Sequence, residues 1–282
     1  MIDANLLQSL LRMYPAQPAT AIWRAVEIEA LLRVGIPEGR GLDLGCGDGK
    51  LTGVILDRTG PRCLVGVDPD PLETKVASKT GFYEAVHTTG GSIIPEPDGS
   101  FDFVISNSVL EHVPDLAPVL KEAARVLRPG GIFLFTVPGP GFHGNLRGGL
   151  LPWVSRTCYL VDLDKRLSHL RYPTVKQWRQ LCSAAGLELV GCSGYLNRGE
   201  TRTWEMLSRV TGGFLYTLRG KRKLPIAIQR ELGLRQLQNR VRIPSVVARV
   251  IGAVIQHLAG SDREQWLSED EASCLLVHGT RL

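Results

Sequence analysis

Short apolar runs alternate with amphipathic segments along the first two hundred residues. Runs rich in β-branched and aromatic residues predict strands at 41–45, 63–68, 83–88, 101–107, 131–137 and 187–195. Apolar residues at helical spacing predict helices at 48–58, 72–79, 115–128 and 174–186, the last beginning at Thr174 and closing at Gly186. This alternation is typical of an α/β protein whose parallel sheet carries helices on both faces.

The pattern changes after residue 195. Residues 196–268 favour helix, with breaks at Gly212-Gly213, Gly220, Pro225 and Pro244, and residues 273–282 then predict one more strand. A strand that follows so long an excursion indicates a helical insertion before the last strand of the sheet. We therefore expect a core at 1–195 with an N-terminal helical cap, an insertion at 196–268, and a final core strand within 269–282.

The composition is that of a soluble globular chain, with 44% hydrophobic and 22% charged residues. Charge is uneven, because residues 196–260 hold twelve Lys and Arg against three acidic residues, a net +9 within a chain of net +5. The apolar run at 243–260 is short and contains Arg249, which argues against a transmembrane helix. Six scattered cysteines form no metal or disulfide pattern, so we expect reduced thiols, no metal site and a cytoplasmic protein.

A glycine-rich turn follows the first predicted strand, in "LDLGCGDGK" at 42–50. Such a turn lets the backbone approach a cofactor closely. Lys50 is followed by Leu51, which excludes a P-loop, and Lys50 also stands where a dinucleotide fingerprint needs its third glycine. What remains is an acid before the turn, Asp43, and the spacing G-x-G-x-G. An ordinary tight turn is the alternative.

The turn resembles the first motif of the class I S-adenosylmethionine (SAM)-dependent methyltransferases. "LVGVDPDP" at 64–71, "PEPDGSFDFVISNSVLEHVPD" at 95–115 and "VLRPGGIFLFTVP" at 126–138 are similar to further motifs of that family, in the same order. The resemblance implies a Rossmann-like seven-stranded methyltransferase sheet, SAM as cofactor, and a transferase. It says little about the acceptor.

By this resemblance, Asp68 would hydrogen-bond the ribose of SAM and Asp43 would lie near its methionine amino group. Many relatives carry an acid facing the adenine where this chain has Gly90, Gly91 and Ser92, so backbone groups and Ser92 would replace it. The cofactor residues that the resemblance implies are Asp43, Gly45, Cys46, Gly47, Asp68, Pro69, Gly91, Ser92, Asn107 and Val109.

Methyl transfer to a hydroxyl is helped by a general base. We expect His112, just after the fourth predicted strand, or His143, after the fifth, to be catalytic, since ligands bind at the carboxyl edge of such sheets. A structural histidine is the alternative for each. Residues expected near the acceptor are Tyr14, Arg24, His169 and Tyr172.

The basic insertion predicts either a cap packed on the domain, a dimerisation element, or an amphipathic contact with an anionic membrane. Few aromatic residues and no RNA-binding signature make nucleic acid an unlikely partner. We expect a methyltransferase acting on a small, lipid-like or amphiphilic acceptor, most plausibly at oxygen. The alternatives are a SAM-binding scaffold without catalysis and an RNA or protein methyltransferase.

Overall fold

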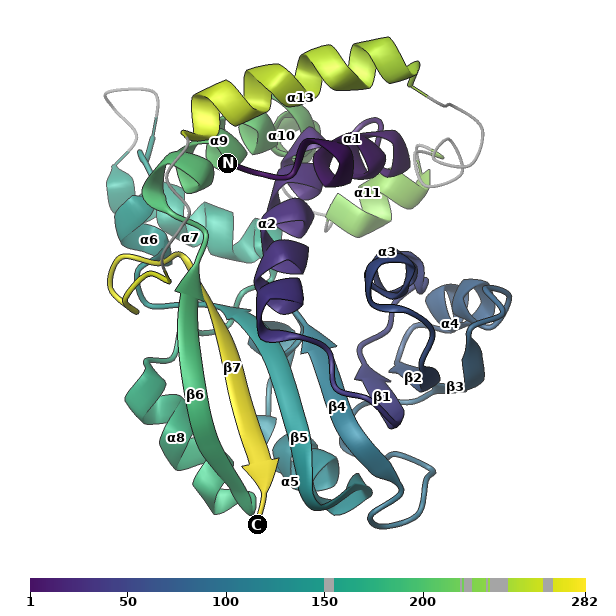
Figure 1. Cartoon of the computed structure of the whole chain (residues 1–282). Helices are drawn as coiled ribbons and strands as arrows, with labels where there is room; N and C mark the ends of the chain where they lie inside the picture. The colour runs from purple at the N-terminus through teal and green to yellow at the C-terminus, as the bar shows by residue number, and fades with distance from the viewer. Residues whose placement is uncertain (150–154, 219, 221–224, 232, 234–242, 261–265) are drawn as a thin grey trace. The chain divides into compact units, whose positions relative to one another are not determined.

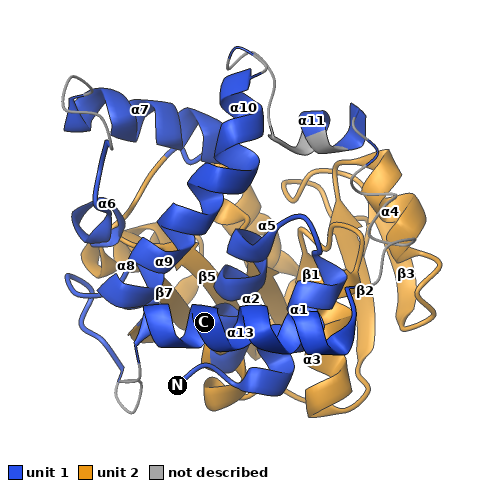
Figure 2. Cartoon of the chain, turned by 90° about the horizontal axis from the view of Figure 1, so that it is seen from above, with its two compact units in different colours: residues 1–29, 140–170, 195–273 blue, residues 30–139, 171–194, 274–282 orange. Residues whose placement is uncertain are grey.

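The computed structural model divides the chain into two compact units, coloured separately in Figure 2. The sheet unit comprises residues 30–139, 171–194 and 274–282, and the helical unit comprises residues 1–29, 140–170 and 195–273. The structure describes residues 1–149, 155–218, 220, 225–231, 233, 243–260 and 266–282.

The sheet unit is built on seven strands in the order β3-β2-β1-β4-β5-β7-β6 (Figure 1). The strands are β1 (Arg40–Leu44), β2 (Cys63–Asp68), β3 (Tyr83–Thr88), β4 (Phe101–Asn107), β5 (Leu127–Pro138), β6 (Leu187–Tyr195) and β7 (Cys274–Arg281). The pairs formed among β1 to β5 are parallel, and β7 pairs antiparallel with β5. The predicted seven-stranded α/β fold is confirmed, with its helical insertion between β6 and β7.

Helices α3 (Lys50–Thr59), α4 (Pro71–Ala77), α5 (Leu116–Val126) and α8 (Val175–Ala184) accompany this sheet. Their starts follow capping chemistry, since Asp70 and Asp115 accept backbone N–H groups and Thr174 forms a capping box with Gln177. Strand side chains, the apolar face of α5 and Trp178 of α8 share one core. Parallel strands β1, β2, β3 and β4 therefore end at one edge, where ligands bind in such folds.

Strand β5 begins four residues earlier than the sequence predicts. The helix predicted at 115–128 included Leu127, but Leu127 is fully buried and pairs with Phe101 of β4. The register then shifts between Phe101 and Phe103, and Gly130 adopts a φ of 73°. Burial of Leu127 thus extends the strand toward the N-terminus, and the irregularity in the ladder accommodates the additional residues of β5.

The helical unit contains α1 (Ala4–Met13), most of α2 (Pro18–Val34), α6 (Phe142–Asn145), α7 (Arg156–Leu167), α9 (Arg198–Ser208), the π-helix η2 (Arg209–Gly213), α10 (Phe214–Leu218), α11 (Pro225–Glu231) and α13 (Ser245–Ala259). Helix α13 runs beside α1 and also contacts α9 (Figures 1 and 2). Trp23, Phe142 and Trp204 form an aromatic cluster at ring separations of 5.4 to 5.8 Å. The long connection after β5 therefore contains helices of its own.

Among the residues that the structure describes, no helix combines the length and hydropathy needed to cross a membrane. Seven of the twelve basic residues counted in 196–260 lie outside the described residues, namely Arg219, Lys221, Arg222, Lys223, Arg235, Arg240 and Arg242.

Candidate functional site

The glycine turn lies at the carboxyl end of β1 and is bonded to β2. The N–H groups of Gly45 and Cys46 both donate to the Val67 carbonyl, at 2.8 and 3.0 Å. Gly45 and Gly47 have φ angles of 83° and 53°. A Cβ on Gly45 would stand 2.4 Å from Val109, whereas no atom of the described residues lies within 4 Å of the same position at Gly47. Gly45 is thus required by packing, and Gly47 leaves open space beside the backbone.

Asp68 ends β2 and is held by two backbone donors. The Gly47 N–H reaches its Oδ2 at 3.0 Å, and the Asp70 N–H reaches its Oδ1 at 2.9 Å. Hydrogen bonds to an ionised carboxylate are stronger than neutral ones. The half-buried Asp68 carboxylate is therefore fixed in orientation and tied to the open turn, with the exposed Pro69 beside it.

Asp43 is buried in β1 and accepts two side-chain hydrogen bonds. Thr52 of α3 and Tyr83 of β3 donate their hydroxyls to Asp43 Oδ2, each at 2.5 Å. Burial raises the pKa of Asp43, and the nearby charge of Asp68 acts in the same direction, whereas the two hydrogen bonds oppose the rise. Sequence reasoning missed Thr52 and Tyr83, although a hydroxyl in the first turn after the glycines was a usable signal.

Cys46 lies within the turn and is buried. Burial, followed by the charges of Asp43 and Asp68, raises the pKa of its thiol above the ordinary value of a cysteine. The thiol therefore stays protonated and is not a nucleophile. The same acids make this edge of the sheet electronegative, which favours a cationic ligand.

The end of β4 contributes Asn107, whose side chain is 8% exposed. Its Oδ1 is buried, and no hydrogen-bond partner for it exists within the described ranges. A buried carbonyl oxygen without a partner costs about 1–3 kcal/mol. Such an atom indicates a missing donor, which a ligand can supply. Val109, two residues on, packs against Gly45.

Residues 89–99 form the loop after β3. A Cβ on Gly91 would stand 2.7 Å from Leu44, so packing against β1 requires this glycine, whereas Ser92 is exposed. Arg125 of α5 holds the loop by donating to the carbonyls of Ile94 and Glu96, at 2.9 and 3.0 Å. The loop is therefore anchored, with Ser92 facing solvent.

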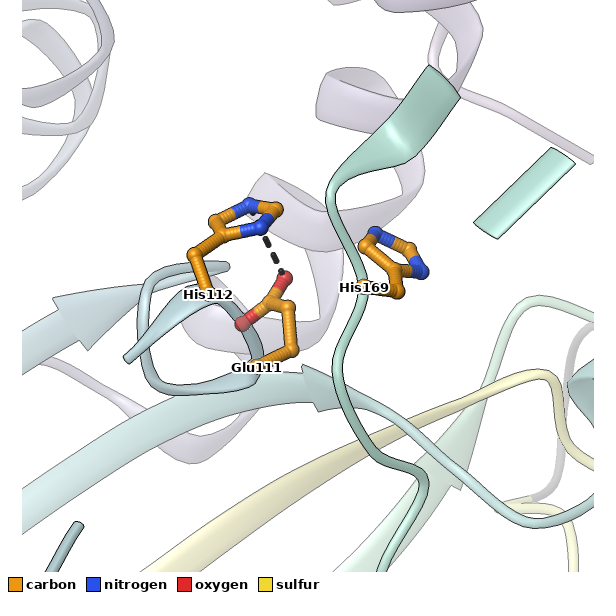
Figure 3. A group of neighbouring side chains, drawn as sticks. All are labelled: Glu111, His112 and His169. Atoms are coloured by element: carbon orange, nitrogen blue, oxygen red, sulfur yellow. Dashed lines mark ion pairs between the residues drawn. The ribbon is translucent and has the colours of Figure 1, made fainter. Parts of the chain in front are cut away.

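His112 lies just past the end of β4, in the 3₁₀ turn η1 (Leu110–His112), beside Glu111 (Figure 3). Its Nε2 stands 3.8 Å from Glu111 Oε1, and the two side chains are 40% and 1% exposed. A carboxylate next to an imidazole stabilises the imidazolium that forms when the histidine takes a proton. The arrangement can serve as a solvent-accessible general base.

Four other residues expected at the site belong to the helical unit: Tyr14, Arg24, His143 and His169. His143 Nε2 lies 2.9 Å from Asp164 Oδ1, and both side chains are half-buried. Arg24 pairs with the buried Glu27. The backbone N–H of Tyr14 caps α1, and His169 packs near Phe142 at a ring separation of 5.8 Å. Their functional roles stay predictions.

Tyr172 is in the sheet unit and lines a pocket of about 460 Å³. A volume of this size suits a small organic ligand. Arg171, which also lines the pocket, is fixed by donating to the Pro114 carbonyl at 2.6 Å. The full lining is Arg171, Tyr172, Pro173, Gln177, Gln180, Leu181 and Ala184.

Comparison with known proteins agrees with this geometry. A family model described as "Methyltransferase domain" matches residues 19–191. The chain is 39% identical over 99 residues to a probable S-adenosylmethionine-dependent methyltransferase of Mycolicibacterium smegmatis, covering 34% of this chain and 37% of that protein. It is 35% identical over 111 residues to a ubiquinone biosynthesis O-methyltransferase of Xanthomonas campestris pv. campestris, covering 37% and 46%. The chain thus spans less than half the length of both relatives.

A solved structure from Thermotoga maritima, described as a SAM-dependent methyltransferase and possible histamine N-methyltransferase, has a similar fold. It superposes with a TM-score of 0.54 at 17% identity, covering 99% of this chain and 96% of that one. At this identity the likeness concerns the fold alone.

Proposed function

The chain belongs to the methyltransferase-domain family, and we propose that it transfers a methyl group from SAM to a small-molecule acceptor. That membership confirms the resemblance drawn from the sequence and, with it, SAM as the expected cofactor of the domain. Bound SAM supplies an activated methyl carbon, so the protein's tasks are to hold the reactants, align them and exclude water.

One observation carries the proposal: a buried acceptor, Asn107 Oδ1, has no partner within the described part of the chain, at the edge where Asp68 and Gly47 also lie. An amine or hydroxyl of the cofactor would satisfy Asn107, and ribose hydroxyls suit a fixed carboxylate. The electronegative edge favours a sulfonium. We assign cofactor binding to Asp43, Gly45, Cys46, Gly47, Asp68, Pro69, Gly91, Ser92, Asn107 and Val109.

The direct test is calorimetric titration with SAM and with S-adenosylhomocysteine (SAH). We expect both to bind, and Asp68→Ala to weaken binding about 10- to 100-fold, because hydrogen bonds to a charged group contribute about 1.5–3 kcal/mol. Asp57→Asn, an exposed acid on α3, is the matched control and should bind like the native chain. A folded native chain that binds neither compound would refute the proposal.

We assign the general base to His112, supported by its position after β4 and by Glu111 at 3.8 Å. His112 would take the proton of the attacking hydroxyl while Glu111 stabilises the resulting imidazolium. His112→Gln should then lower kcat about 100-fold or more and remove the acidic limb of the pH–rate profile. His143, already paired with Asp164, is the second candidate, and a loss confined to His143→Gln would reverse the assignment.

Transfer to oxygen is supported by the likeness to a ubiquinone biosynthesis O-methyltransferase. The sequence nominates Tyr14, Arg24, His169 and Tyr172 as acceptor-binding residues, and of these Tyr172 lines the pocket of the sheet unit. Incubation with methyl-labelled SAM and a panel of phenols, carboxylic acids and amines tests the attacked atom. Labelled phenols or acids support the assignment, labelled amines overturn it, and SAH binding with no labelled product favours the SAM-binding scaffold.

A second proposal concerns membranes, and the exposed face of α13 favours it. Val246, Val250 and Val254 recur every four residues there and are 64%, 59% and 53% exposed. The opposite face, with Ala248, Gly252 and Ile255, is buried. Aliphatic side chains within a segment of net charge +9 suit the surface of an anionic membrane.

Flotation with phosphatidylserine-rich vesicles tests this contact, with phosphatidylcholine vesicles as the neutral comparison. We expect salt-sensitive binding to the anionic vesicles that Val250→Asp with Val254→Asp abolishes. Val190→Asp, at a valine of β6 that is 58% exposed, is the matched control and should float like the native chain. Absence of flotation at low salt, or a dimer dissociated by the α13 substitutions, would overturn the proposal.

A further inference from the structure

Arg166, on α7, is a buried guanidinium with very little to bind. The residue is 8% exposed, and within the described ranges its one hydrogen bond goes to the Ser208 carbonyl at 3.4 Å. No carboxylate lies within ion-pair distance of it in the described ranges. An arginine has five N–H donors and keeps its charge in proteins, so most of this group's bonding capacity is unused.

Glu205 of α9, a buried acid that acts electrostatically on Arg166, already accepts several hydrogen bonds. Glu205 accepts hydrogen bonds from the N–H groups of Arg147 and Gly148, at 2.8 and 3.2 Å. It also accepts from the Tyr159 hydroxyl and from Arg209 Nη2, each at 2.7 Å. Arg209 is thereby neutralised, and the cluster of Arg166, Arg209 and Glu205 retains one net positive charge in a buried setting.

A glycine, Gly213, lies against the guanidinium of Arg166. A Cβ on Gly213 would stand 2.0 Å from Arg166 Nη1, so only glycine fits there. Gly213 ends η2, the π-helical stretch between α9 and α10, and such distortions are frequent at functional sites. Burial lowers the pKa of Arg166, and the neighbouring charge of Arg209 lowers it further. A bound anion would relieve both effects.

We propose that Arg166 binds the oxyanion of a small molecule, a carboxylate or a phosphate group. A guanidinium can donate two parallel N–H bonds to two oxygens of either group. Tyr216 of α10, also buried and electrostatically close to Arg166, has no hydrogen bond from its hydroxyl within the described residues and can donate to the same ligand. Identifying this ligand with the methyl acceptor rests on the proposed function, whereas oxyanion binding itself does not.

Thermal unfolding at constant ionic strength, with inorganic phosphate or benzoate replacing chloride, tests the site. At a few times the Kd, the preferred anion should raise the Tm of the native chain by about 2–4 °C. Arg166→Met should lose this response while keeping an anion-free Tm equal to or above the native one, because an uncompensated buried charge has been removed. The matched control, Arg12→Met on the exposed side of α1, should respond like the native chain.

Arg166→Lys is a second variant in case Arg166→Met fails to fold. It keeps the positive charge at position 166 but loses the paired N–H donors of the guanidinium. We expect it to fold and to bind the anion several-fold more weakly. The proposal is overturned by a native chain that responds to neither anion, by an Arg166→Met variant that still responds, or by a large anion-free loss of Tm that Arg166→Lys restores. SAH titration of the same samples reports on the proposed function separately, because Arg166→Met should bind SAH normally.

Discussion

The carboxylate of Asp68 in the sheet unit and that of Glu205 in the helical unit are held in different ways. At the sheet edge, the Asp68 carboxylate is fixed by backbone N–H groups of two turns, at Gly47 and Asp70. In the helical unit, Glu205 is fixed by side chains of α7 and η2 and by the backbone near Arg147. The first arrangement is encoded in short motifs, and the second exists only once distant helices have packed.

The difference predicts where each unit is vulnerable. The sheet edge should lose ligand affinity when one turn is altered, while its fold survives. The helical unit should lose stability when the charge of Glu205 is removed, because the several donors that bind it then lose a shared partner.

The largest expected effect is that of Glu205→Gln in the helical unit. Arg147, Tyr159 and Arg209 all donate hydrogen bonds to Glu205. A glutamine would turn its own amide N–H groups toward some of these donors and leave the charge of Arg209 without a counter-charge. We expect a loss of about 3–5 kcal/mol in the free energy of unfolding, measured by urea titration. Asp270→Asn, at an exposed acid of the same unit, should change it little. Equal losses of unfolding free energy in Glu205→Gln and Asp270→Asn would show that the hydrogen bonds of Glu205 do not stabilise the helical unit.

A matched pair of glycine substitutions sharpens the contrast at the sheet edge. Gly45→Ala should destabilise the fold by about 2–4 kcal/mol, from its left-handed φ and the contact with Val109. The Cβ of Gly47→Ala would meet no atom of the part of the chain that the structure describes. This variant should cost only about 1 kcal/mol, yet weaken SAH binding about tenfold or more. Urea unfolding and calorimetry separate the two outcomes. Unchanged SAH affinity in Gly47→Ala would remove this turn from the site.

Stability of the helical unit should also depend on pH through Glu200, a buried residue of α9. Burial raises the pKa of Glu200 to about 7, above its ordinary 4.5. A raised carboxyl pKa stabilises the protonated fold, so this contribution is fully present below pH 4.5 and is lost as the pH rises through 7. Between about pH 5.5 and about pH 8, the free energy of unfolding should fall by about 2 kcal/mol from this group.

Glu200→Gln keeps an acceptor for the Asn197 N–H but cannot titrate. Its urea-unfolding free energy should therefore vary less between the two pH values than that of the native chain. If native and variant curves run parallel, Glu200 is ionised in the folded protein and the pH argument fails.

The sequence predicts the sheet unit well because its strands and turns are local signals. The expected ranges 63–68, 83–88 and 101–107 match β2, β3 and β4 residue for residue. Sequence reasoning did not identify Thr52 and Tyr83, because their hydrogen bonds to Asp43 join three elements that come together only in the folded sheet. Arg166 and Glu205 were missed for the same reason. In the sequence, a charged helical residue that packing buries looks the same as one on a solvent-exposed helix face.

The smallest expected effect compares one tyrosine from each unit. Tyr83→Phe removes a donor to Asp43, so the pKa of Asp43 should rise further and SAH affinity should fall several-fold, about 1 kcal/mol. The fall should grow as the pH is lowered, because less of Asp43 is then ionised. Tyr159→Phe removes the equivalent donor to Glu205 and should lower stability while leaving SAH affinity unchanged. Equal losses of SAH affinity in both variants would contradict the division drawn between the two units.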